Sequence, residues 1–402
     1  MLAELDDLPP PNNGILSFKP DDIDPLIRNV VTAVQPSAVL GLSNPTIIGD
    51  VMFMCIRHTD QLNDDDKLER LFTAFVRGVR KSVKQHKLDV DVLLMWLTNL
   101  HRLSNHMKQY SGEQKFMVDS TEKQRSHCLV NFDLSELRTM VNDEAISVFD
   151  TVLAAYQTVL QQQIVPCLLE YDGIAASTGG RQPKKPHAAE TKSNNDSLTS
   201  PRSNLTMDGL LVQMAQILNQ CQAFRVDTFV MRLLFHGLVH FIVCTALNNL
   251  MLRRELCNST KGLSIRFNLS TIEQWLRDRD FADLIGLLEP IVQACHLLQS
   301  NKATLHTTVH EICPKLSVQQ VVKILSIYDP VDQWDSKVPI SQIKQIETAL
   351  RRRRGDEVVI NEPLFLNTRC HLPVSFPFKS TPTEFDTLPI PLDLNLDFLK
   401  RI

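Results

Sequence analysis

Three side chains capable of binding a metal recur at helical spacing near the middle of the chain. His236, His240 and Cys244 are four residues apart, so a helix would place them on one face. Imidazole and thiolate are ligands that Zn²⁺ prefers, but zinc protease helices also carry a glutamate between their histidines, and here that stretch reads Gly-Leu-Val. The apolar neighbours favour core histidines bonded to backbone or to Asn partners. Zinc binding stays open as the alternative, and no metal or other cofactor is predicted.

Two further features could act through charge. Arg351–Arg354 precede Gly355, and cations at a helix C-terminus offset the helix dipole, which favours a solvated face over a contact with acidic partners or phosphates. Ser200 precedes Pro201 in a polar stretch and is a candidate for phosphorylation, which would add about −1.5 to −2 charge. No nucleophile–base pair or phosphate-binding loop accompanies these groups, so no catalytic residue is predicted.

Composition narrows the class of protein. A chain of 402 residues is long enough for two or three cores. The net charge of −4 comes from interspersed charges of both signs, which argues against nucleic acid as the main partner. Nine cysteines without C-x-x-C spacing are typical of reduced thiols in a cytosolic protein. The acidic, proline-rich start lacks the features of a signal peptide.

Apolar stripes predict a protein built from helices. Leu68, Leu71, Phe75, Val79 and Val83 recur every three or four residues, and residues 93–107 and 141–159 show the same pattern. Trp96 and Trp275 fall within such stripes and are expected in the core. The apolar run of residues 233–252 is interrupted by histidines and asparagines, so we interpret it as a buried helix of a soluble protein.

Capping signals divide these stripes into separate helices. Asn44 followed by Pro45 predicts one helix start, and Asp133, Ser270 and Ser317 each precede Glu or Gln by three residues, as in a capping box. Residues 173–205 lack the apolar residues that a core needs and are predicted to form a flexible loop. Prolines exclude continuous helix from the last 45 or so residues, whose regular apolar anchors suggest an extended strap lying in a groove.

Several phrases occur in an order that is specific to one family. They are MFMCIRHTDQLNDDDK at 52–67, MKQYSGE at 107–113, KGLSIRFNLSTIEQWLRD at 261–278, LLEPIVQACHLLQ at 287–299, ICPKLSVQQVVKILSIYDP at 312–330 and the final LPVSFPFKSTPTEFDTLPIPLDLNLDFLKRI. With them the chain closely resembles the dilute-type domain, the globular cargo-binding tail of class V myosins. The resemblance runs from about Gly14 to Ile402, apart from the segment around residues 173–205.

The resemblance and the stripes together imply an all-α fold. It has two helical-bundle lobes joined by long helices, with an extended C-terminal strap that, by resemblance, packs back on the first lobe. The expected parts are a flexible N-terminal segment (1–14), helical lobe I (15–172), a disordered loop (173–205), connecting helices (206–257), helical lobe II (258–365) and the strap (366–402).

The resemblance also assigns roles to individual residues. It implies that Phe267 and Gln299 belong to a face that binds Rab-type small GTPases, with Phe267 replacing a tyrosine common in vertebrate relatives. From the residues alone, Phe267 is a buried anchor before the predicted Ser270 cap. Arg254 and Lys323 match two basic positions that contact the motor head in the inhibited state. The family commonly has lysine where this chain has Arg254, and the two side chains are not equivalent at a fixed contact.

By resemblance, the chain binds cargo adaptor peptides and a Rab-type GTPase, and it docks on its own motor head. It is expected in the cytoplasm, on vesicles or organelles along actin, with no direct membrane insertion and no enzyme activity of its own. The alternatives are a dilute-type domain of a non-motor junctional scaffold, or a zinc-binding helical protein.

Overall fold

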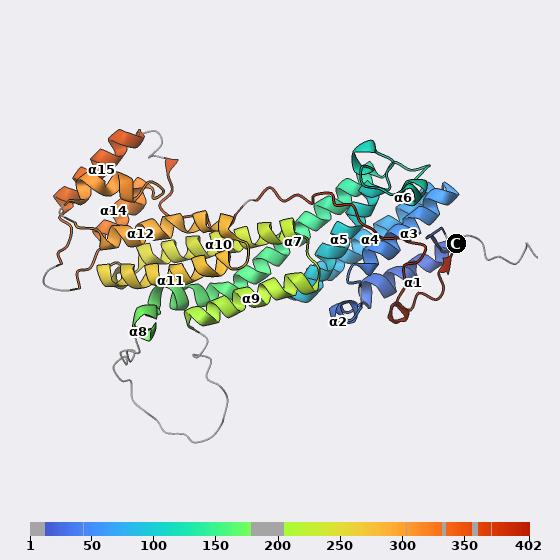
Figure 1. Ribbon diagram of the computed structural model, residues 1–402, viewed down its shortest axis with the longest axis horizontal. Coiled ribbons are helices and arrows are strands. Elements are labelled where there is room, and N and C mark those ends of the chain that lie inside the picture. The colour runs from blue at the N-terminus through green and yellow to red at the C-terminus, as the bar shows by residue number, and fades with distance from the viewer. Residues whose placement is uncertain are drawn as a thin grey trace, which may run out of the picture. The chain divides into compact units, whose positions relative to one another are not determined.

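The computed structural model describes residues 13–42, 44–177, 205–302, 304–331, 335–355, 361–370 and 372–402. Helices dominate it, as the apolar stripes predict, and the all-α fold class is confirmed (Figure 1). The chain divides into two compact units. Unit 1 comprises residues 1–155, 218–234 and 373–402, and unit 2 comprises residues 156–217 and 235–372. The division falls within three of the long helices.

Unit 1 holds the N-terminal helices and the end of the chain. Its elements are β1 (Leu16–Ser17), η1 (Pro20–Asp22), α1 (Ile23–Ile27), η2 (Arg28–Thr32), α2 (Pro36–Leu40), α3 (Ile47–Leu62), α4 (Asp65–Gln85), α5 (Val90–Gln109), η3 (Gln114–Phe116), α6 (Glu122–Ser126), most of α7 (Ser135–Ile164), η8 (Leu392–Leu394) and β2 (Lys400–Arg401).

Unit 2 holds the helices that carry most of the predicted site residues. It contains most of α9 (Met207–Ala223) and α10 (Thr228–Leu252). Its other elements are η4 (Val165–Glu170), α8 (Gly173–Ser177), η6 (Arg254–Leu256), α11 (Ser259–Arg277), η7 (Ala282–Leu288), α12 (Glu289–Gln299), α13 (Leu305–Ile312), α14 (Val318–Ser326) and α15 (Ile340–Arg354).

A buried polar centre joins α3 to α5 in unit 1. The Asp50 carboxylate accepts hydrogen bonds from His106 Nε2 (2.6 Å), Arg102 Nε (2.7 Å) and Asn44 Nδ2 (2.6 Å). These contacts lower the pKa of Asp50 to about 2 despite its burial. Burial and the Arg102 charge lower the pKa of His106 to about 4, so at neutral pH a neutral imidazole donates to a charged carboxylate.

The C-terminal strap of unit 1 lies along α5. Side chains four residues apart on that helix bond backbone groups two residues apart on the strap: His101 with Pro377 O, Asn105 with Lys379 N, and Gln109 with Thr381 N and O. Four helical residues rise about 6 Å and two extended residues span about 6.6 Å, so the two repeats match. The helix side chains therefore provide hydrogen bonds that a second strand would otherwise make.

The strap ends in a short sheet. Residues 400–401 of β2 pair antiparallel with residues 16–17 of β1, which the stripe pattern does not predict. The neighbouring backbone is also held, since Asn13 N donates to Ile402 O (3.0 Å) and Arg57 donates to the carbonyls of Asn13 and Gly14. The N-terminal segment predicted to be flexible through residue 14 is therefore bonded at its last two positions, and its first twelve lie outside the described residues.

Helix α10 contributes much of the core of unit 2. Phe235 stacks on Phe281, with ring centroids 4.7 Å apart, and on Trp275 at 5.7 Å. By length and composition alone, the 25-residue α10 could cross a membrane, although histidines and asparagines interrupt its apolar run. However, 72% of its most apolar window is buried in the protein, which is typical of a core helix.

The helix caps differ from the sequence expectations in three places. Helix α3 begins at Ile47 rather than after Asn44, whose side chain instead accepts from Thr46 N. Asp133 accepts from Ser135 N within a turn that precedes α7. Ser270 opens no helix, because α11 runs unbroken from its cap at Asn258 and the Ser270 hydroxyl donates to Phe267 O. Only the Ser317 box, with Gln320, forms as predicted.

The first five residues of the predicted loop form a helix instead. Gly173–Ser177 form α8, which Asp172 supports by accepting from Ala175 N. Gly173 is buried, and a Cβ there would lie 2.9 Å from Phe267 Cδ1 and closer still to Asn268. The close approach to α11 therefore orders this stretch, although its composition is that of a loop. Residues 178–204 lie outside the described residues.

The His106 environment predicts a specific acid sensitivity. Its folded pKa of about 4 lies below the unfolded value near 6.5, so the unfolded state binds the proton first as pH falls. The contribution of His106 to the unfolding free energy should be constant above about pH 6.5. Below that pH it should fall by about 1.4 kcal/mol per pH unit, down to pH 4. Between pH 7.5 and 5.0, the unfolding free energy of His106→Gln, measured with urea, should fall by about 2 kcal/mol less than that of the unsubstituted chain.

The exposed His86 provides the matched control for this comparison. His86→Gln should retain the full acid loss, because it removes an exposed histidine and leaves the buried His106 unchanged. An identical acid loss in His106→Gln and the unsubstituted chain would contradict the assignment of a buried neutral imidazole.

Candidate functional site

The structure places Arg254 and Lys323 in one neighbourhood of unit 2. Arg254 lies in η6 and forms an ion pair with Asp329 (2.7 Å), six residues beyond Lys323 of α14. Asp329 N also donates to Cys257 O (2.8 Å), which fixes the two segments together. Burial raises the pKa of the Cys257 thiol to about 12.

These two cations are available to a partner in different degrees. The Arg254 side chain is 56% exposed, and its ion pair with a half-exposed carboxylate is of the surface kind that contributes little to stability. Lys323 is half-buried. Nothing in the spacing of residues 254 and 323 predicts that they lie in one neighbourhood.

Phe267 lies on α11 with part of its ring uncovered. It is 38% exposed, and Leu263, one turn earlier on the same face, is 51% exposed. The interpretation of Phe267 as a buried anchor before a Ser270 cap is therefore wrong, because the helix continues through both residues. Large apolar side chains that are adjacent and exposed are typical of a contact surface.

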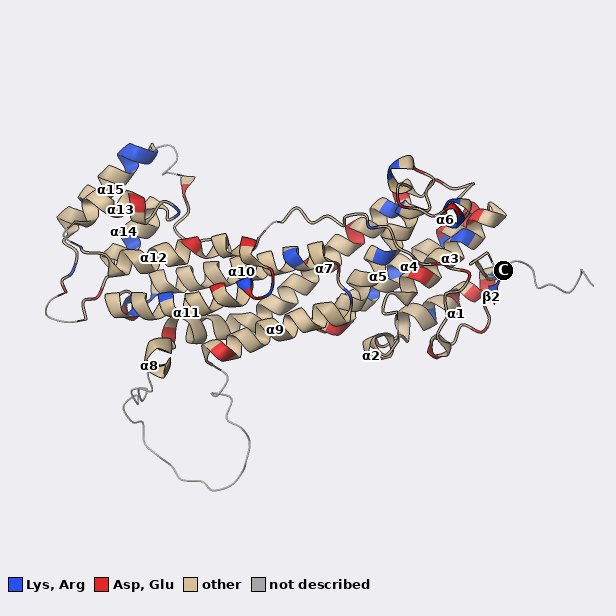
Figure 2. Ribbon diagram, in the orientation of Figure 1, with Lys and Arg blue, Asp and Glu red and all other residues tan. Residues whose placement is uncertain are grey.

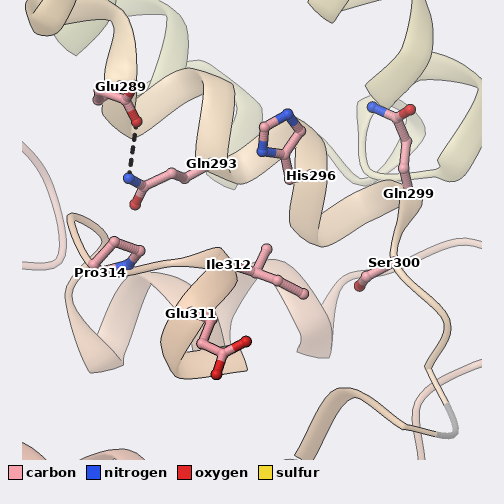
Figure 3. Close-up of a pocket in the computed structure, with 8 residues that line it drawn as sticks. All are labelled: Glu289, Gln293, His296, Gln299, Ser300, Glu311, Ile312 and Pro314. Carbon is pink, nitrogen blue, oxygen red and sulfur yellow. Dashed lines mark hydrogen bonds between the residues drawn. The ribbon is translucent and has the colours of Figure 1, made fainter. Parts of the chain in front are cut away.

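Gln299 lies at the end of α12, beside a cavity of about 490 Å³ (Figure 3). Its Nε2 donates to Cys295 O (3.1 Å) of its own helix. Two polar groups in the cavity are also engaged, since Gln293 donates to Glu289 (3.0 Å) and accepts from Lys315 N (2.7 Å). The other lining residues are His296, Ser300, Glu311, Ile312 and Pro314. The amides of Gln293 and Gln299 are therefore held in place by bonds within the protein.

The structure does not bring Phe267 directly against Gln299. Gln299 lies against Gly262 of α11, where a Cβ would be 3.4 Å from Gln299 Cγ. Phe267 is five residues further along α11, which turns it about 140° around the helix, toward Gly173. Sequence reasoning missed Gly262, whose signal is a glycine within a helical pattern, where close packing is a common reason.

The histidine–cysteine face has a structural use within α10. His240 Nε2 lies 3.0 Å from Asn367 O and 3.3 Å from Cys244 Sγ. Burial raises the pKa of Cys244 to about 12 and lowers the pKa of His236. Across the parts of the chain that the structure describes, no group of three His, Cys, Asp or Glu residues is arranged to hold a metal ion.

The arginine run ends α15, as the sequence predicts, with Gly355 at φ +86°. Figure 2 shows the basic residues gathered at this end of the helix. Arg354 is not simply solvated, since it donates to Leu316 O (2.6 Å) and Cys313 O (3.0 Å) and lies 3.3 Å from a Glu362 oxygen. Ser200, the candidate phosphorylation site, lies outside the described residues.

Comparison with known proteins links this architecture to one group of motors. Residues 233–332 match the DIL domain model. The chain is 33% identical over 395 residues to unconventional myosin-Vb of Homo sapiens and 32% identical over 393 residues to unconventional myosin-Va of Gallus gallus. Both alignments cover 97% of this chain and 21% of the relative, so the chain spans about a fifth of their length.

Solved structures share the fold. The yeast myosin 5 cargo-binding domain has a TM-score of 0.65 at 16% identity, and the alignment covers 95% of each chain. The apo Myo2 globular tail has a TM-score of 0.63 at 14% identity, covering 94% of this chain and 98% of the other.

The contact of α11 with α12 should depend on Gly262. A Cβ at this position would lie 2.9 Å from Leu298 Cβ and 3.2 Å from Cys295 O, so Gly262→Ala should force the helices apart. We expect a loss of about 1–3 kcal/mol in unfolding free energy, despite the better helix propensity of alanine. Gly286→Ala is the matched control, because nothing lies within 4 Å of its added Cβ. Equal urea midpoints for both variants would contradict the close packing.

Proposed function

The chain belongs to the globular tails of class V myosins and contains their DIL domain, and on that premise we propose how it connects cargo to an actin-based motor. The cargo-binding tail itself has no motor domain. We propose that it binds adaptor peptides and a Rab-type small GTPase, and docks on the motor head to hold the motor idle. Similarity to class V myosins over 97% of the chain favours this function over a junctional scaffold.

Adaptor binding is the first part of the proposal. Related globular tails of Myo2 have been solved in complex with Mmr1, Smy1 and Inp2, with TM-scores of 0.62, 0.57 and 0.58 to this chain. These partners support a role for the shared fold in holding adaptor proteins. In this chain, grooves between helices would accept short helical or extended peptides. The tail would then be cytoplasmic and would reach vesicles or organelles through its adaptors.

The face around α11 and α12 is the proposed GTPase contact. Phe267 and Leu263 offer exposed apolar area, and Gln299 offers an amide at the edge of the neighbouring cavity. Because Phe267 and Gln299 lie on different sides of α11, a partner must extend over that helix to reach both. An interface of standard size, about 800 Å² per partner, is large enough. Phe267 lacks the hydroxyl of the tyrosine it replaces, so one hydrogen bond would be missing.

The pairing of η6 with the end of α14 is the observation that carries the autoinhibition proposal. Arg254 of η6 pairs with Asp329, just beyond the end of α14 on which Lys323 lies, and Arg254 is exposed there. An acidic site on the motor head would be attracted to both charges. Inhibition then requires two states of similar free energy, one with the tail docked on the head and one with cargo bound to the tail.

Charge reversal at Lys323 should release the motor. In the full-length motor protein, Lys323→Glu should raise actin-activated ATPase activity without added cargo by about fivefold or more, because a like charge replaces an attraction. Adaptor affinity of the isolated tail should not change. Lys87→Glu, an exposed lysine of unit 1, is the matched control and should leave the motor inhibited. An ATPase rate that stays inhibited in Lys323→Glu would refute the docking role.

Substitution at Gln299 should weaken GTPase binding. Gln299→Arg places a longer cation at the cavity edge, and we expect the capture of GTP-loaded Rab proteins to fall about tenfold or more in a pull-down. Gln345→Arg makes the same change at an exposed position of α15 and should leave capture intact. Undiminished capture by Gln299→Arg would remove this residue from the interface.

A further inference from the structure

A groove between α14 and α15 has no role in the functions proposed so far. It encloses about 630 Å³ within unit 2, a volume typical of ligand-binding pockets. Its apolar lining comes from the end of α14, the segment before α15 and the first turns of α15. These residues are Val322, Leu325, Ile327, Val338, Ile340 and Ile343.

Ile340 gives this groove an uncovered apolar edge. Its neighbours Leu325, Val338 and Ile343 are buried, whereas Ile340 itself is 74% exposed. A single exposed isoleucine is ordinary on a protein surface. Here it continues a buried apolar floor outward, so a partner covering it would extend an existing core rather than create a new one.

Charge around the groove selects the chemistry of a partner. Arg254, Lys337 and Lys344 line it, and Glu347 is the one carboxylate among the described lining residues. Glu347 is already paired with Arg351 at 2.9 Å. Neither Lys337 nor Lys344 has a carboxylate partner within the described part of the chain. Arg254 is likewise paired with Asp329 at 2.7 Å. The groove therefore has an apolar floor and a rim where Lys337 and Lys344 add positive charge.

The first turn of α15 adds to this preference for negative charge. The helix of 15 residues begins after Pro339 without a side-chain cap and without an acidic residue in its first turn. Its first N–H groups and the positive end of the helix dipole therefore lie beside Ile340 without a compensating anion. A carboxylate brought in by a partner would complement both this helix end and the two lysines.

We propose that this groove binds a short amphipathic helix of an adaptor protein, in which Asp or Glu residues flank the apolar anchors. This inference rests on the proposed adaptor binding, and it names one site and one partner chemistry for it. Anchors at positions i, i+3 or i+4, and i+7 would cover Ile340 and the apolar floor, as in other helix-in-groove complexes. Because Arg254 lines the same groove, a seated peptide would cover a residue proposed to contact the motor head.

Peptide selection tests the site even when the natural adaptor is unidentified. A phage-displayed library of random peptides of about 16 residues is selected on the chain, and binders are counter-selected on Ile340→Asp. Peptides that depend on Ile340 should be enriched in apolar residues at helical spacing flanked by Asp or Glu. Their synthetic forms should bind Ile340→Asp and Lys344→Glu at least about tenfold more weakly than the unsubstituted chain.

Two controls separate the site from general surface effects. Val212→Asp places the same charge on another exposed apolar residue of unit 2, and Lys87→Glu reverses an exposed lysine of unit 1. Both should bind the selected peptides with unchanged affinity. Circular dichroism and urea midpoints equal to those of the unsubstituted chain establish that the exposed substitutions leave the fold intact.

Three outcomes would overturn the proposal that this groove is the binding site. The selection could yield no peptides whose binding depends on Ile340, or such peptides could lack enrichment in Asp and Glu. Alternatively, Val212→Asp could weaken peptide binding as much as Ile340→Asp does. If natural adaptors bind the chain and their affinity is unaffected by Ile340→Asp, the proposal of adaptor binding stands and only its assignment to this groove is refuted. If no adaptor binds the unsubstituted chain, the proposed function itself fails.

Discussion

The structure depends on satisfying the backbone of an extended, proline-rich segment that can form neither helix nor a long sheet. Buried N–H and C=O groups need partners, and here helix side chains provide them. In unit 2, Asn248 holds both the N–H and the carbonyl of Leu366, at 2.9 Å each. In unit 1, Gln109 makes the same double contact with Thr381, at 3.0 Å each. An amide side chain suits this use because it carries a donor and an acceptor side by side.

The same constraint explains polar residues whose spacing in the sequence is that of metal ligands. His240 and Cys244 have metal-ligand spacing, but the imidazole lies against Asn367 O of the extended segment. The apolar stripes predict the helical class because burying one face of a helix requires that period. They cannot predict Asn248 or Gln109 as anchors, since the partner backbone is more than a hundred residues away in sequence. Local caps fail for a related reason: Ser270 has the spacing of a capping box, but packing keeps α11 continuous through it.

Unit 2 offers cations and apolar groups at its surface in places that helical periodicity does not single out. Arg254 lies in the same neighbourhood as the end of α14, where Lys323 is found, because Asp329 N donates to Cys257 O and the Asp329 carboxylate pairs with Arg254. Phe267 is partly exposed, and its ring lies so close to Gly173 of α8 that a Cβ there would be 2.9 Å from Phe267 Cδ1. The position of each residue on its helix could be read from the sequence, whereas their neighbours come from tertiary contacts. The resemblance to a known family identified these positions as candidates, and the structure shows which residues surround each of them.

Amide hydrogen exchange of the extended segment tests the central constraint most directly. If helix side chains replace a paired strand, the amides of Leu366 and Thr381 should exchange at least about a hundredfold more slowly than an unstructured peptide, although neither lies in a helix or a strand. Asn248→Ala should remove protection at Leu366 and leave Thr381 protected. Exchange of both amides at the unstructured rate in the unsubstituted chain would contradict the account, because the segment would then be held by its apolar anchors alone.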